Sequence, residues 1–462
     1  MYQIDFEHPI HVHFIGIGGS SMSGLAELLH TRGFTVSGSD AQHNAACDHL
    51  ESMGLSIAYG QCASNITPDI DLVVYTAAVH PDNLEFQAAA NANIPMMDRA
   101  EFLGQLMKQY KDAISIAGTH GKTTTSSMLA MILLEAELDP TISLGAVLEP
   151  IHSSSRSGHS EHFVVESCEY TNSFLKFFPK HEIILNIEAE HLDFFKDIDD
   201  IRHSFRLFME KLTAESHLVI QGDIEQLDTL TAGLPAQLTT YGIASAERSY
   251  DYSAANISFD ANGFGSYDLM HGNTVLAHIS LGVVGIHNIS NSVAAAAMAD
   301  LLGVPLTAIV SALCKFGGAK RRFEKKGERN GVTIVDDYAH HPTEIRATLL
   351  AAQNYPHNKV WCIFQPHTFS RTKALLQELA EALSLADRIV LADIYASRET
   401  DPGDISSGDI LDLLTKQGKE AWHFHHFDEI EKFLLSNCTN GDLLITMGAG
   451  DIVKVGESLL KE

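Results

Sequence analysis

A glycine-rich turn near residue 120 carries side chains that could bind a phosphate chain. The turn consists of Gly118, Thr119, His120, Gly121, Lys122, Thr123 and Thr124, between a β-rich run at 113–117 and a helical pattern over 122–135. Glycines in such a turn let backbone N–H groups face a phosphate, and the start of the helix adds partial positive charge. Lys122 can then reach the terminal phosphates, and Thr123 can bind Mg²⁺. The pattern predicts a nucleoside triphosphate site, with a plain turn and a surface lysine as the alternative.

A second glycine turn lies near the amino terminus, where residues 16–21 separate a β-rich run from a helical one. Asp40 lies 22 residues beyond Gly18, where a carboxylate that binds a ribose often occurs. Ser21 takes the position of the third glycine of the dinucleotide fingerprint. The pattern predicts a pyrophosphate-binding turn, with a plain strand-to-helix turn as the alternative. It does not distinguish NAD from a UDP-sugar.

Acidic side chains and one histidine follow two further strands of the central region. They are Glu166 and Glu169 after the run 162–165, and Glu190, His191 and Asp193 after the run 183–186. The γ-phosphate of a nucleotide repels a second anion by about 4 kcal/mol per unit charge pair, at 4 Å and an effective dielectric of 20. One lysine cannot offset several such pairs, so metal ligands beyond Thr123 are expected. Each acid alone is typical of a solvated loop, but together, at the carboxyl ends of strands, they favour a metal site.

The composition is that of an ordinary soluble, folded protein: 462 residues, 45% hydrophobic and 19% charged, with a mean hydropathy of +0.01. At about 150 residues per domain, this length predicts roughly three domains. The 31 Lys and Arg against 59 Asp and Glu give a formal net charge of −28. That excess repels nucleic acids and anionic membrane surfaces, so neither is expected as a partner, whereas a small anionic ligand is compatible with it.

The cysteines and the amino terminus indicate an intracellular protein. The six cysteines are scattered without a CxxC pair, which predicts reduced thiols. The first residues lack a basic region followed by an apolar core, and no run approaches the roughly 18 apolar residues of a membrane span. We therefore expect a protein of the cytoplasm. The sequence leaves both a monomer and a homodimer open.

Strands and helices alternate in three stretches of the chain. The first runs from about residue 9 to residue 110 and includes a strand at 71–76. The second begins at 113–117 and ends in short β-rich runs with Asn-Gly and Gly-Asn turns at 262–263 and 272–273, which predict antiparallel hairpins. The third carries strands at 332–335, 359–365, 388–393, 420–424 and 442–447, with helices between them. The predicted fold class is α/β with doubly wound sheets.

Seven segments, spread over nearly the whole chain, resemble those of the Mur ligase family, which builds the stem peptide of peptidoglycan. In chain order they are 16–24, 117–125, 186–193, 285–291, 321–324, 335–342 and 364–372. The turn at 117–125 is similar to the family's ATP loop, and that at 16–24 to its UDP-binding turn. The segments 335–342 and 364–372 resemble the branch that adds the first amino acid. Arg206 lies where ligases that add later residues often carry a carbamylated lysine, which fits the same branch.

The resemblance implies three domains: a Rossmann-like UDP-sugar-binding domain at 1–109, a central P-loop ATPase-like α/β domain with appended antiparallel strands at 110–318, and a Rossmann-like closing domain at 319–462. It also implies an ATP-dependent acid–amino-acid ligase of peptidoglycan and cell-wall synthesis. ATP would phosphorylate the lactyl carboxylate of UDP-N-acetylmuramate. The amine of L-alanine would then attack the acyl phosphate, with release of ADP and phosphate. The implied cofactors are ATP and Mg²⁺, which Mn²⁺ could replace.

The same resemblance implies roles for individual residues. Lys122, Glu169, His191, His341 and Arg371 would be catalytic, and Thr123, Glu169 and His191 would bind metal. Besides the turn at 118–124, ATP would contact His287, Asn291, Arg322 and Asp337. The UDP-sugar would contact Gly16, Gly18, Gly19, Ser20, Ser21, Asp40 and Thr76. Cys168 stands where the family often has a further carboxylate, which leaves Glu169 as the metal ligand.

Three alternative functions stay open at this point. A muropeptide ligase would attach a recycled tripeptide to the same UDP-sugar, and the segment 364–372 argues against it because its counterpart in that enzyme usually differs. An NAD-dependent oxidoreductase would use the first glycine turn but would leave the turn at 118–124 without a role. A UDP-sugar sensor would bind ATP without turnover, so it would have no activity to lose on substitution of Lys122.

Overall fold

The computed structural model describes residues 2–76, 78–397 and 399–461, and the chain divides into two compact units. The first unit comprises residues 1–187, 199–239 and 298–304, and the second comprises 188–198, 240–297 and 305–462. The short segment 188–198 therefore belongs to the second unit, although the chain before it and after it belongs to the first.

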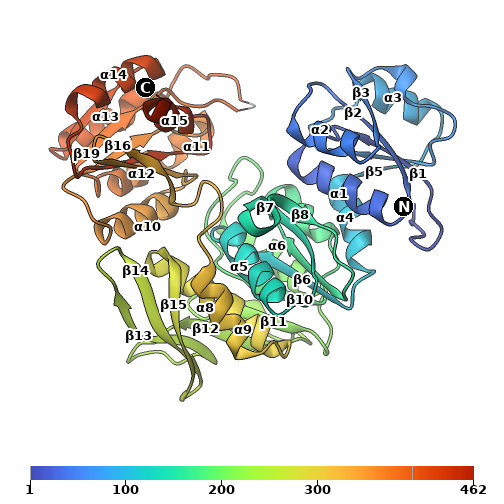
Figure 1. Ribbon diagram of the computed structural model, residues 1–462, viewed down its shortest axis with the longest axis horizontal. Coiled ribbons are helices and arrows are strands. Elements are labelled where there is room, and N and C mark those ends of the chain that lie inside the picture. The colour runs from blue at the N-terminus through green and yellow to red at the C-terminus, as the bar shows by residue number, and fades with distance from the viewer. Residues whose placement is uncertain (1, 77, 398, 462) are drawn as a thin grey trace. The chain divides into compact units, whose positions relative to one another are not determined.

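A five-stranded parallel sheet forms the amino-terminal part of the first unit (Figure 1). Its elements are β1 (His11–Ile15), α1 (Ser20–Thr31), β2 (Thr35–Asp40), α2 (Ala45–Ser52), β3 (Ser56–Tyr59), η1 (Ala63–Asn65), β4 (Leu72–Tyr75), α3 (Leu84–Asn91), β5 (Met96–Asp98) and α4 (Arg99–Met107). The strand order β3-β2-β1-β4-β5 reverses its winding between β1 and β4. Ligands of open α/β sheets bind at such a reversal, beyond the carboxyl ends of the strands. The glycine turn after β1 lies at this point.

The second sheet of the first unit holds the turn at 118–124. Its elements are β6 (Asp112–Ala117), α5 (Lys122–Glu135), β7 (Thr141–Leu148), η2 (Glu149–Ile151), β8 (Ser153–Arg156), β9 (His162–Glu166), η3 (Tyr170–Lys176), β10 (His181–Ile184), α6 (Ile198–Met209), β11 (His217–Gln221) and α7 (Leu227–Thr231). Strand β6 lies between β9 and β10, parallel to both. Helix α5 is buried throughout residues 123–133, because it carries apolar or small side chains on every side. The turn thus joins a central strand to a core helix.

Antiparallel strands form one part of the second unit. The elements here are β12 (Gln237–Ile243), β13 (Tyr252–Phe259), β14 (Phe264–His271), β15 (Thr274–Val284), α8 (Ile286–Leu301) and α9 (Leu306–Lys315). Strand β14 pairs antiparallel with β13 and with β15, and β12 pairs parallel with β13. The turns at 262–263 and 272–273 join the two hairpins, so the prediction from the Asn-Gly and Gly-Asn dipeptides is confirmed.

A six-stranded sheet forms the carboxyl-terminal part of the second unit. Its elements are β16 (Glu324–Arg329), β17 (Val332–Asp337), α10 (Pro342–Gln353), β18 (Val360–Phe364), α11 (Phe369–Ala374), α12 (Leu376–Leu383), β19 (Arg388–Leu391), α13 (Ser407–Lys416), β20 (Glu420–His423), α14 (Phe427–Asn437), β21 (Leu443–Met447) and α15 (Val453–Lys461). The order is β16-β17-β21-β18-β19-β20, parallel except at β16. Cys362 of β18 packs in a core with α10 and α12, whereas its neighbour Trp361 packs in another with α14 and α15. Because side chains alternate along a strand, helices cover both faces of this sheet.

Strand β16 is the one strand of the carboxyl-terminal sheet that the sequence analysis did not predict. Its residues, Glu-Lys-Lys-Gly-Glu-Arg, show neither an apolar run nor an alternation of apolar and polar side chains. The strand lies at the edge of the sheet, antiparallel to β17, with a register irregularity between Lys325 and Gly327. This segment adopts a strand conformation because it pairs with β17, and such pairing cannot be recognised from a hydrophobic pattern.

The predicted fold class is confirmed, because the chain contains three α/β parts with antiparallel strands appended to the second. The helix predicted at 122–135 is α5, and the five strands predicted after residue 330 are β17 to β21. The domain ranges 1–109, 110–318 and 319–462 stay predictions. Among the described residues, every helix is too short or too polar to cross a membrane.

His13 is a buried ionisable residue of the first sheet. It lies on β1, is 2% exposed, and its Nδ1 is 2.9 Å from Oγ of Ser37. Burial and, to a smaller extent, the nearby His11 together lower the pKa of His13 to about 4. The imidazole is therefore neutral in the folded protein at pH 7.

Protonation of His13 is expected to destabilise the fold as the pH falls. An unfolded histidine titrates near pH 6.5, so the unfolded chain binds the proton first, and stability is lost as the pH falls from about 6.5 towards 4. Between pH 7 and pH 5 this residue accounts for about 2 kcal/mol of the free energy of unfolding. Urea titrations of the wild type and of His13→Asn at both pH values should show a smaller pH effect in the variant. His152→Asn, which changes an exposed histidine, is the control. An equal pH effect in wild type and His13→Asn would contradict this account.

Candidate functional site

The turn at 118–124 depends on backbone conformations that glycine adopts easily. Gly121, the residue before α5, has a φ of +82°, and Gly118 has a φ of +144°. A Cβ atom on Gly118 would lie 2.9 Å from the Cβ of Leu185. Because a side chain at either position would be strained, the two glycines keep the turn and its N–H groups in this shape.

Lys122, the first residue of α5, directs its ammonium group back into the turn. Its Nζ donates to the carbonyl oxygen of Thr119 at 3.0 Å and to Oε2 of Glu169 at 3.0 Å. The side chains of Lys122 and Glu169 are only 13% and 3% exposed. Burial opposes the charge of Lys122, but the carboxylate of Glu169 outweighs it and raises the pKa of the lysine. Lys122 is thus a largely buried, permanently charged cation at the place predicted for a triphosphate.

Thr123 and Glu169 suit a divalent cation beside this turn. Both are buried, and they offer a hydroxyl and a carboxylate oxygen, the hard donors that Mg²⁺ prefers. Glu166 is engaged elsewhere, because its Oε2 accepts the backbone N–H of Gly145 at 2.8 Å. Burial raises the pKa of the Cys168 thiol to about 11, so this residue is neutral. The donor set of the first unit therefore fits Mg²⁺ through Thr123 and Glu169.

Asn186 is a candidate functional residue to which the sequence analysis gave no role. Its Oδ1 accepts the backbone N–H of His120 at 2.7 Å, and its Nδ2 donates to the carbonyl of the same residue at 3.1 Å. Its own carbonyl oxygen accepts the N–H of Thr119 at 3.2 Å. Asn186 thus holds two peptide groups of the turn from the end of the neighbouring strand, β10. Its place just after β10 is the signal that could have identified it.

The amino-terminal turn is held by Asp40. Oδ2 of Asp40 accepts the backbone N–H of Gly18 at 2.9 Å, so this carboxylate shapes the turn at 16–19. Thr76 follows β4, and its N–H donates to the carbonyl of Ile15 at 3.4 Å. Asp40, at the end of β2, and Thr76, after β4, therefore flank the end of β1 and the turn that follows it. Their contacts with a UDP-sugar stay predictions.

Arg99 is a second residue that the sequence analysis missed. Its Nη1 donates to Oγ of Ser21 at 2.9 Å, at the start of α1. Gly19 is the N-cap of α1 and Ser20 its first residue. Burial lowers the pKa of Arg99, although a guanidinium stays charged at neutral pH. A cation, a glycine turn and a helix start together suit an anionic ligand. A single arginine after a short strand gives no sequence signal.

His287, Arg322 and Asp337 lie within electrostatic reach of one another in the second unit. Burial and then the charge of Arg322 lower the pKa of His287 to about 4. Its buried Nδ1 has no hydrogen-bond partner among the described residues. Asn291 lies one turn further along α8 and is also buried. A neutral imidazole with an unpaired nitrogen, next to a buried amide, fits the predicted contact with a nucleotide base.

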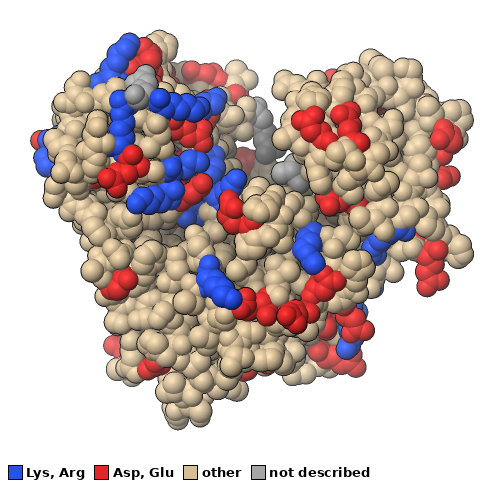
Figure 2. All heavy atoms as spheres, in the orientation of Figure 1, with Lys and Arg blue, Asp and Glu red and all other residues tan. Residues whose placement is uncertain are grey.

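Asp337 ends β17 and organises the chain around it. Its Oδ2 accepts the N–H of Phe323 at 2.7 Å, and its Oδ1 accepts the N–H of Ala339 at 2.8 Å. Burial raises the pKa of Asp337 to about 6, against the opposing effect of Arg322. Figure 2 shows Lys and Arg side chains gathered over the carboxyl-terminal sheet, on a chain whose net charge is strongly negative. The contact of Asp337 with ATP stays a prediction.

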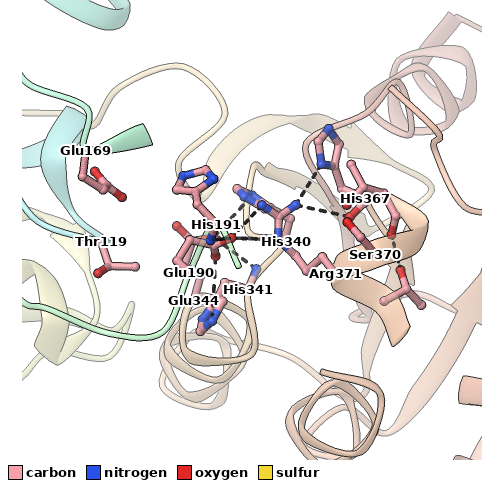
Figure 3. A network of polar contacts seen from close by, with 12 residues as sticks. Thr119, Glu169, Glu190, His191, His340, His341, Glu344, His367, Ser370 and Arg371 are labelled. Atoms are coloured by element: carbon pink, nitrogen blue, oxygen red, sulfur yellow. Dashed lines mark hydrogen bonds and ion pairs between the residues drawn. The ribbon is translucent and has the colours of Figure 1, made fainter. Parts of the chain in front are cut away.

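Glu190, Arg371 and His341 form a buried polar cluster in the second unit (Figure 3). Nη2 and Nε of Arg371 both donate to Oε1 of Glu190, at 2.7 and 3.0 Å. Oε2 of Glu190 lies 3.8 Å from Nε2 of His341. Burial opposes the charge of Glu190, but Arg371 and the nearby histidines lower the pKa of this carboxyl to about 2. His191 follows Glu190 directly and has a φ of +55°.

The structure thus collects the predicted residues into four groups. Within the first unit, the turn at 118–124 lies with Glu169, and the turn at 16–19 with Asp40 and Thr76. Within the second unit, His287 lies near Arg322 and Asp337, and His341 and Arg371 lie around Glu190, next to His191.

Family models match three stretches of the chain: the Mur ligase family catalytic domain at residues 11–111, the Mur ligase middle domain at 116–299, and the Mur ligase glutamate ligase domain at 321–450. Together they cover most of its length. The chain belongs to the Mur ligase family. The family membership that the seven short segments indicated is thereby confirmed.

Relatives extend over the full length of the chain. It is 59% identical to the UDP-N-acetylmuramate–L-alanine ligase of Lachnoclostridium phytofermentans, over 100% of both chains. It is 57% identical to the protein of the same name from Agathobacter rectalis, again over 100% of both chains. Among solved structures, the UDP-N-acetylmuramate-alanine ligase of Thermotoga maritima matches with a TM-score of 0.81 and 28% identity, over 98% of each chain. A murein peptide ligase of Psychrobacter arcticus matches with a TM-score of 0.71 and 26% identity, over 98% of each chain.

The brace that Asn186 forms on the turn gives a prediction about nucleotide use. Asn186→Ala removes two hydrogen bonds to the His120 peptide, each worth about 1 kcal/mol, so kcat/KM for ATP should fall at least about tenfold. The KM for the UDP-sugar should stay within twofold, because the amino-terminal sheet is untouched. Steady-state kinetics with each substrate varied in turn measure both effects. Asn437→Ala, which removes an amide on α14, is the control. An unchanged kcat/KM for ATP in Asn186→Ala would contradict the role of the brace.

Proposed function

We propose that this chain is the ATP-dependent ligase that joins L-alanine to the lactyl carboxylate of UDP-N-acetylmuramate, a step of peptidoglycan synthesis. The observation that carries the proposal is the 59% identity, over the whole of both chains, to a protein named for this reaction. The buried Lys122–Glu169 pair in a glycine turn supports it, because an acid and an amine condense only with an energy source such as ATP. The full-length match to the alanine ligase of Thermotoga maritima has a higher TM-score, 0.81, than the match to the murein peptide ligase, 0.71.

The reaction follows two displacements. A carboxylate oxygen of the UDP-sugar attacks the γ-phosphorus of ATP, and the bond from that phosphorus to the bridging oxygen breaks, which releases ADP. The amine of L-alanine then attacks the acyl carbon, loses a proton, and phosphate leaves with the former carboxylate oxygen. The protein contributes by holding the reacting groups in line and by compensating the charge that they bring together.

Residues of the first unit would supply the charge compensation at ATP. In the structure the Nζ of Lys122 lies at the turn, where it donates to Thr119 and to Glu169. On binding of ATP, this ammonium group would turn towards the terminal phosphates. Thr123 and Glu169 would hold Mg²⁺, and Mg²⁺ when bound would offset the charge between the phosphates and the carboxylate. His191 would supply a nitrogen to a second ion. Mn²⁺ could replace Mg²⁺ with these donors.

The remaining predicted residues would hold the rest of the substrates. His287 and Asn291 would face adenine, and Arg322 the phosphates. The turn at 16–21, now with Arg99, would hold the UDP diphosphate. We also propose the domain ranges 1–109, 110–318 and 319–462, and place the reaction in the cytoplasm, where ATP and UDP-sugars occur.

The choice of amino acid is the first prediction of this function. Phosphate release with ATP, Mg²⁺ and UDP-N-acetylmuramate should be fastest with L-alanine in a panel of amino acids, and absent without the UDP-sugar. The panel includes the tripeptide L-alanyl-γ-D-glutamyl-meso-diaminopimelate. Faster release with that tripeptide than with L-alanine would assign the chain to the muropeptide ligases instead.

The second prediction concerns Lys122. Lys122→Ala should lower kcat by about 10²–10³-fold, because it removes a preorganised cation from the transferring phosphoryl group. Circular dichroism should show that the fold is retained. Lys111→Ala is the matched control, since Lys111 pairs with Glu161 on the surface and both side chains are more than 60% exposed; its activity should stay within twofold. Full activity of Lys122→Ala would exclude the proposed role.

A further inference from the structure

Three side chains of the metal-ligating types lie together at one end of the carboxyl-terminal sheet. They are Asp393, just after β19, and His423 and His425, at the end of β20. One nitrogen of each imidazole and one oxygen of the carboxylate all lie within 4.8 Å of one another. These residues have no part in the proposed function, so the role inferred for them does not depend on it.

The pairing of β19 with β20 brings the three side chains to one place. Side chains two residues apart on a strand point to the same face. Phe424 packs in the core with α14 and α15, so His423 and His425, on either side of it, point to the opposite face. The two strands run parallel, with Leu391 opposite His423. Two residues further along, Asp393 therefore lies beside His425.

The distances within the group match those between atoms that bind one metal ion. Nε2 of His423 lies 2.8 Å from Oδ1 of Asp393, and Nδ1 of His425 lies 3.1 Å from both carboxylate oxygens. Ligand atoms bound to zinc at about 2.0–2.1 Å lie roughly 3.3 Å apart at the tetrahedral angle. Without an ion, the imidazole N–H groups can donate to the carboxylate over the same distances. An ion would replace these hydrogens with little movement of the side chains.

Hydrogen bonds of the backbone hold both strand ends in place. The N–H of Phe424 donates to the carbonyl oxygen of Leu391 at 3.0 Å, and His426 is the N-cap of α14. Oγ of Ser407 donates to the carbonyl oxygen of Ala392 at 2.6 Å. The residues next to the group are therefore fixed before an ion arrives, which lowers the entropic cost of binding.

The chemistry of the donors indicates the class of ion. Two imidazoles and a carboxylate suit Zn²⁺, Co²⁺ or Ni²⁺, whereas Mg²⁺ and Ca²⁺ prefer oxygen ligands alone. The side chain of His423 is 16% exposed, but those of Asp393 and His425 are 54% and 72% exposed, so water can reach the group. We propose that Asp393, His423 and His425 bind one Zn²⁺ or a similar transition-metal ion, with water in the remaining coordination positions.

A bound ion would also restrain the chain that follows β19. Two residues beyond Asp393, the N–H of Tyr395 donates to the carbonyl oxygen of Pro366 at 2.8 Å, and its carbonyl oxygen accepts the N–H of Thr368 at 2.9 Å. The ring of Tyr395 stacks on that of His367, with centroids 5.7 Å apart. The chain after β19 is thus joined to the segment after β18. An ion that holds Asp393 to β20 stabilises this arrangement from the other side.

A titration with Co²⁺, followed by its visible absorption, tests the site. Excess Mg²⁺ is present throughout, so that the oxygen site beside Lys122 is filled. The wild type should bind one Co²⁺ with an intense absorption band, and added Zn²⁺ should remove that band. In His425→Gln the affinity should fall at least about tenfold, because even the partners of metal ligands contribute 10–100-fold. The double variant with His423→Gln should lose the band.

His278→Gln is the matched control. His278 forms a 2.8 Å pair with Asp268 on a strand surface, so its substitution removes a histidine–aspartate contact that has one imidazole in place of two. Its Co²⁺ titration should equal that of the wild type. His425→Gln, which changes a mostly exposed side chain, suffices for the test if the double variant does not fold.

Hydrogen–deuterium exchange supplies a second readout. Added Zn²⁺ should slow exchange in residues 393–397 and 423–426 of the wild type, and should leave exchange in the double variant unchanged. Equal Co²⁺ affinity in the wild type and the double variant would overturn the proposal, and so would exchange at 393–397 that Zn²⁺ does not alter. Absence of phosphate release with L-alanine would contradict the proposed function alone, because both metal measurements are made without substrates.

Discussion

Electrostatic repulsion between anions is the constraint on which this molecule depends. A triphosphate, a diphosphate and a carboxylate would have to meet on a chain that is itself strongly acidic. The structure places largely buried cations at fixed positions, and each is held by a partner: Lys122 by Glu169, Arg371 by Glu190, and Arg99 by the hydroxyl of Ser21. Such charges, once buried, are stable only with their partners in place. The fold therefore positions the partners that these charges need, and the charge pairs in turn stabilise the fold.

The α/β topology decides where these groups lie. In parallel sheets the loops after neighbouring strands meet at one edge, so residues distant in sequence come together without a dedicated scaffold. The turn after β6 meets Asn186 after β10 in this way, and the turn after β1 meets Thr76 after β4. The carboxyl-terminal sheet repeats the principle, because Asp337 ends β17 and His367 follows β18. Rigid strands fix the sites, and short loops carry the chemistry.

Sequence patterns predicted the parts of this arrangement that have a local cause. The turn at 118–124 with α5 follows from glycine, lysine and a long apolar run, and the hairpins at 252–284 follow from their turn dipeptides. The missed features have non-local causes. The folded structure is needed to recognise Asn186, Arg99 and the Glu190–Arg371 pair, because their partners lie on strand ends or helices that are remote in sequence. A single polar residue forms no periodic pattern from which such a contact could be predicted. Asp40 and Arg371 were identified as important residues, but their partners within the protein could not be foreseen.

The edge strand β16 has a consequence for how the protein behaves in a crowded cell. An exposed sheet edge offers unpaired backbone groups to any other extended chain, and two copies can join through them. A short strand of mostly charged residues, interrupted by a register shift, is a poor template for such growth. The charged residues because of which β16 lacks a hydrophobic pattern therefore also hinder strand pairing between molecules at this edge of the carboxyl-terminal sheet.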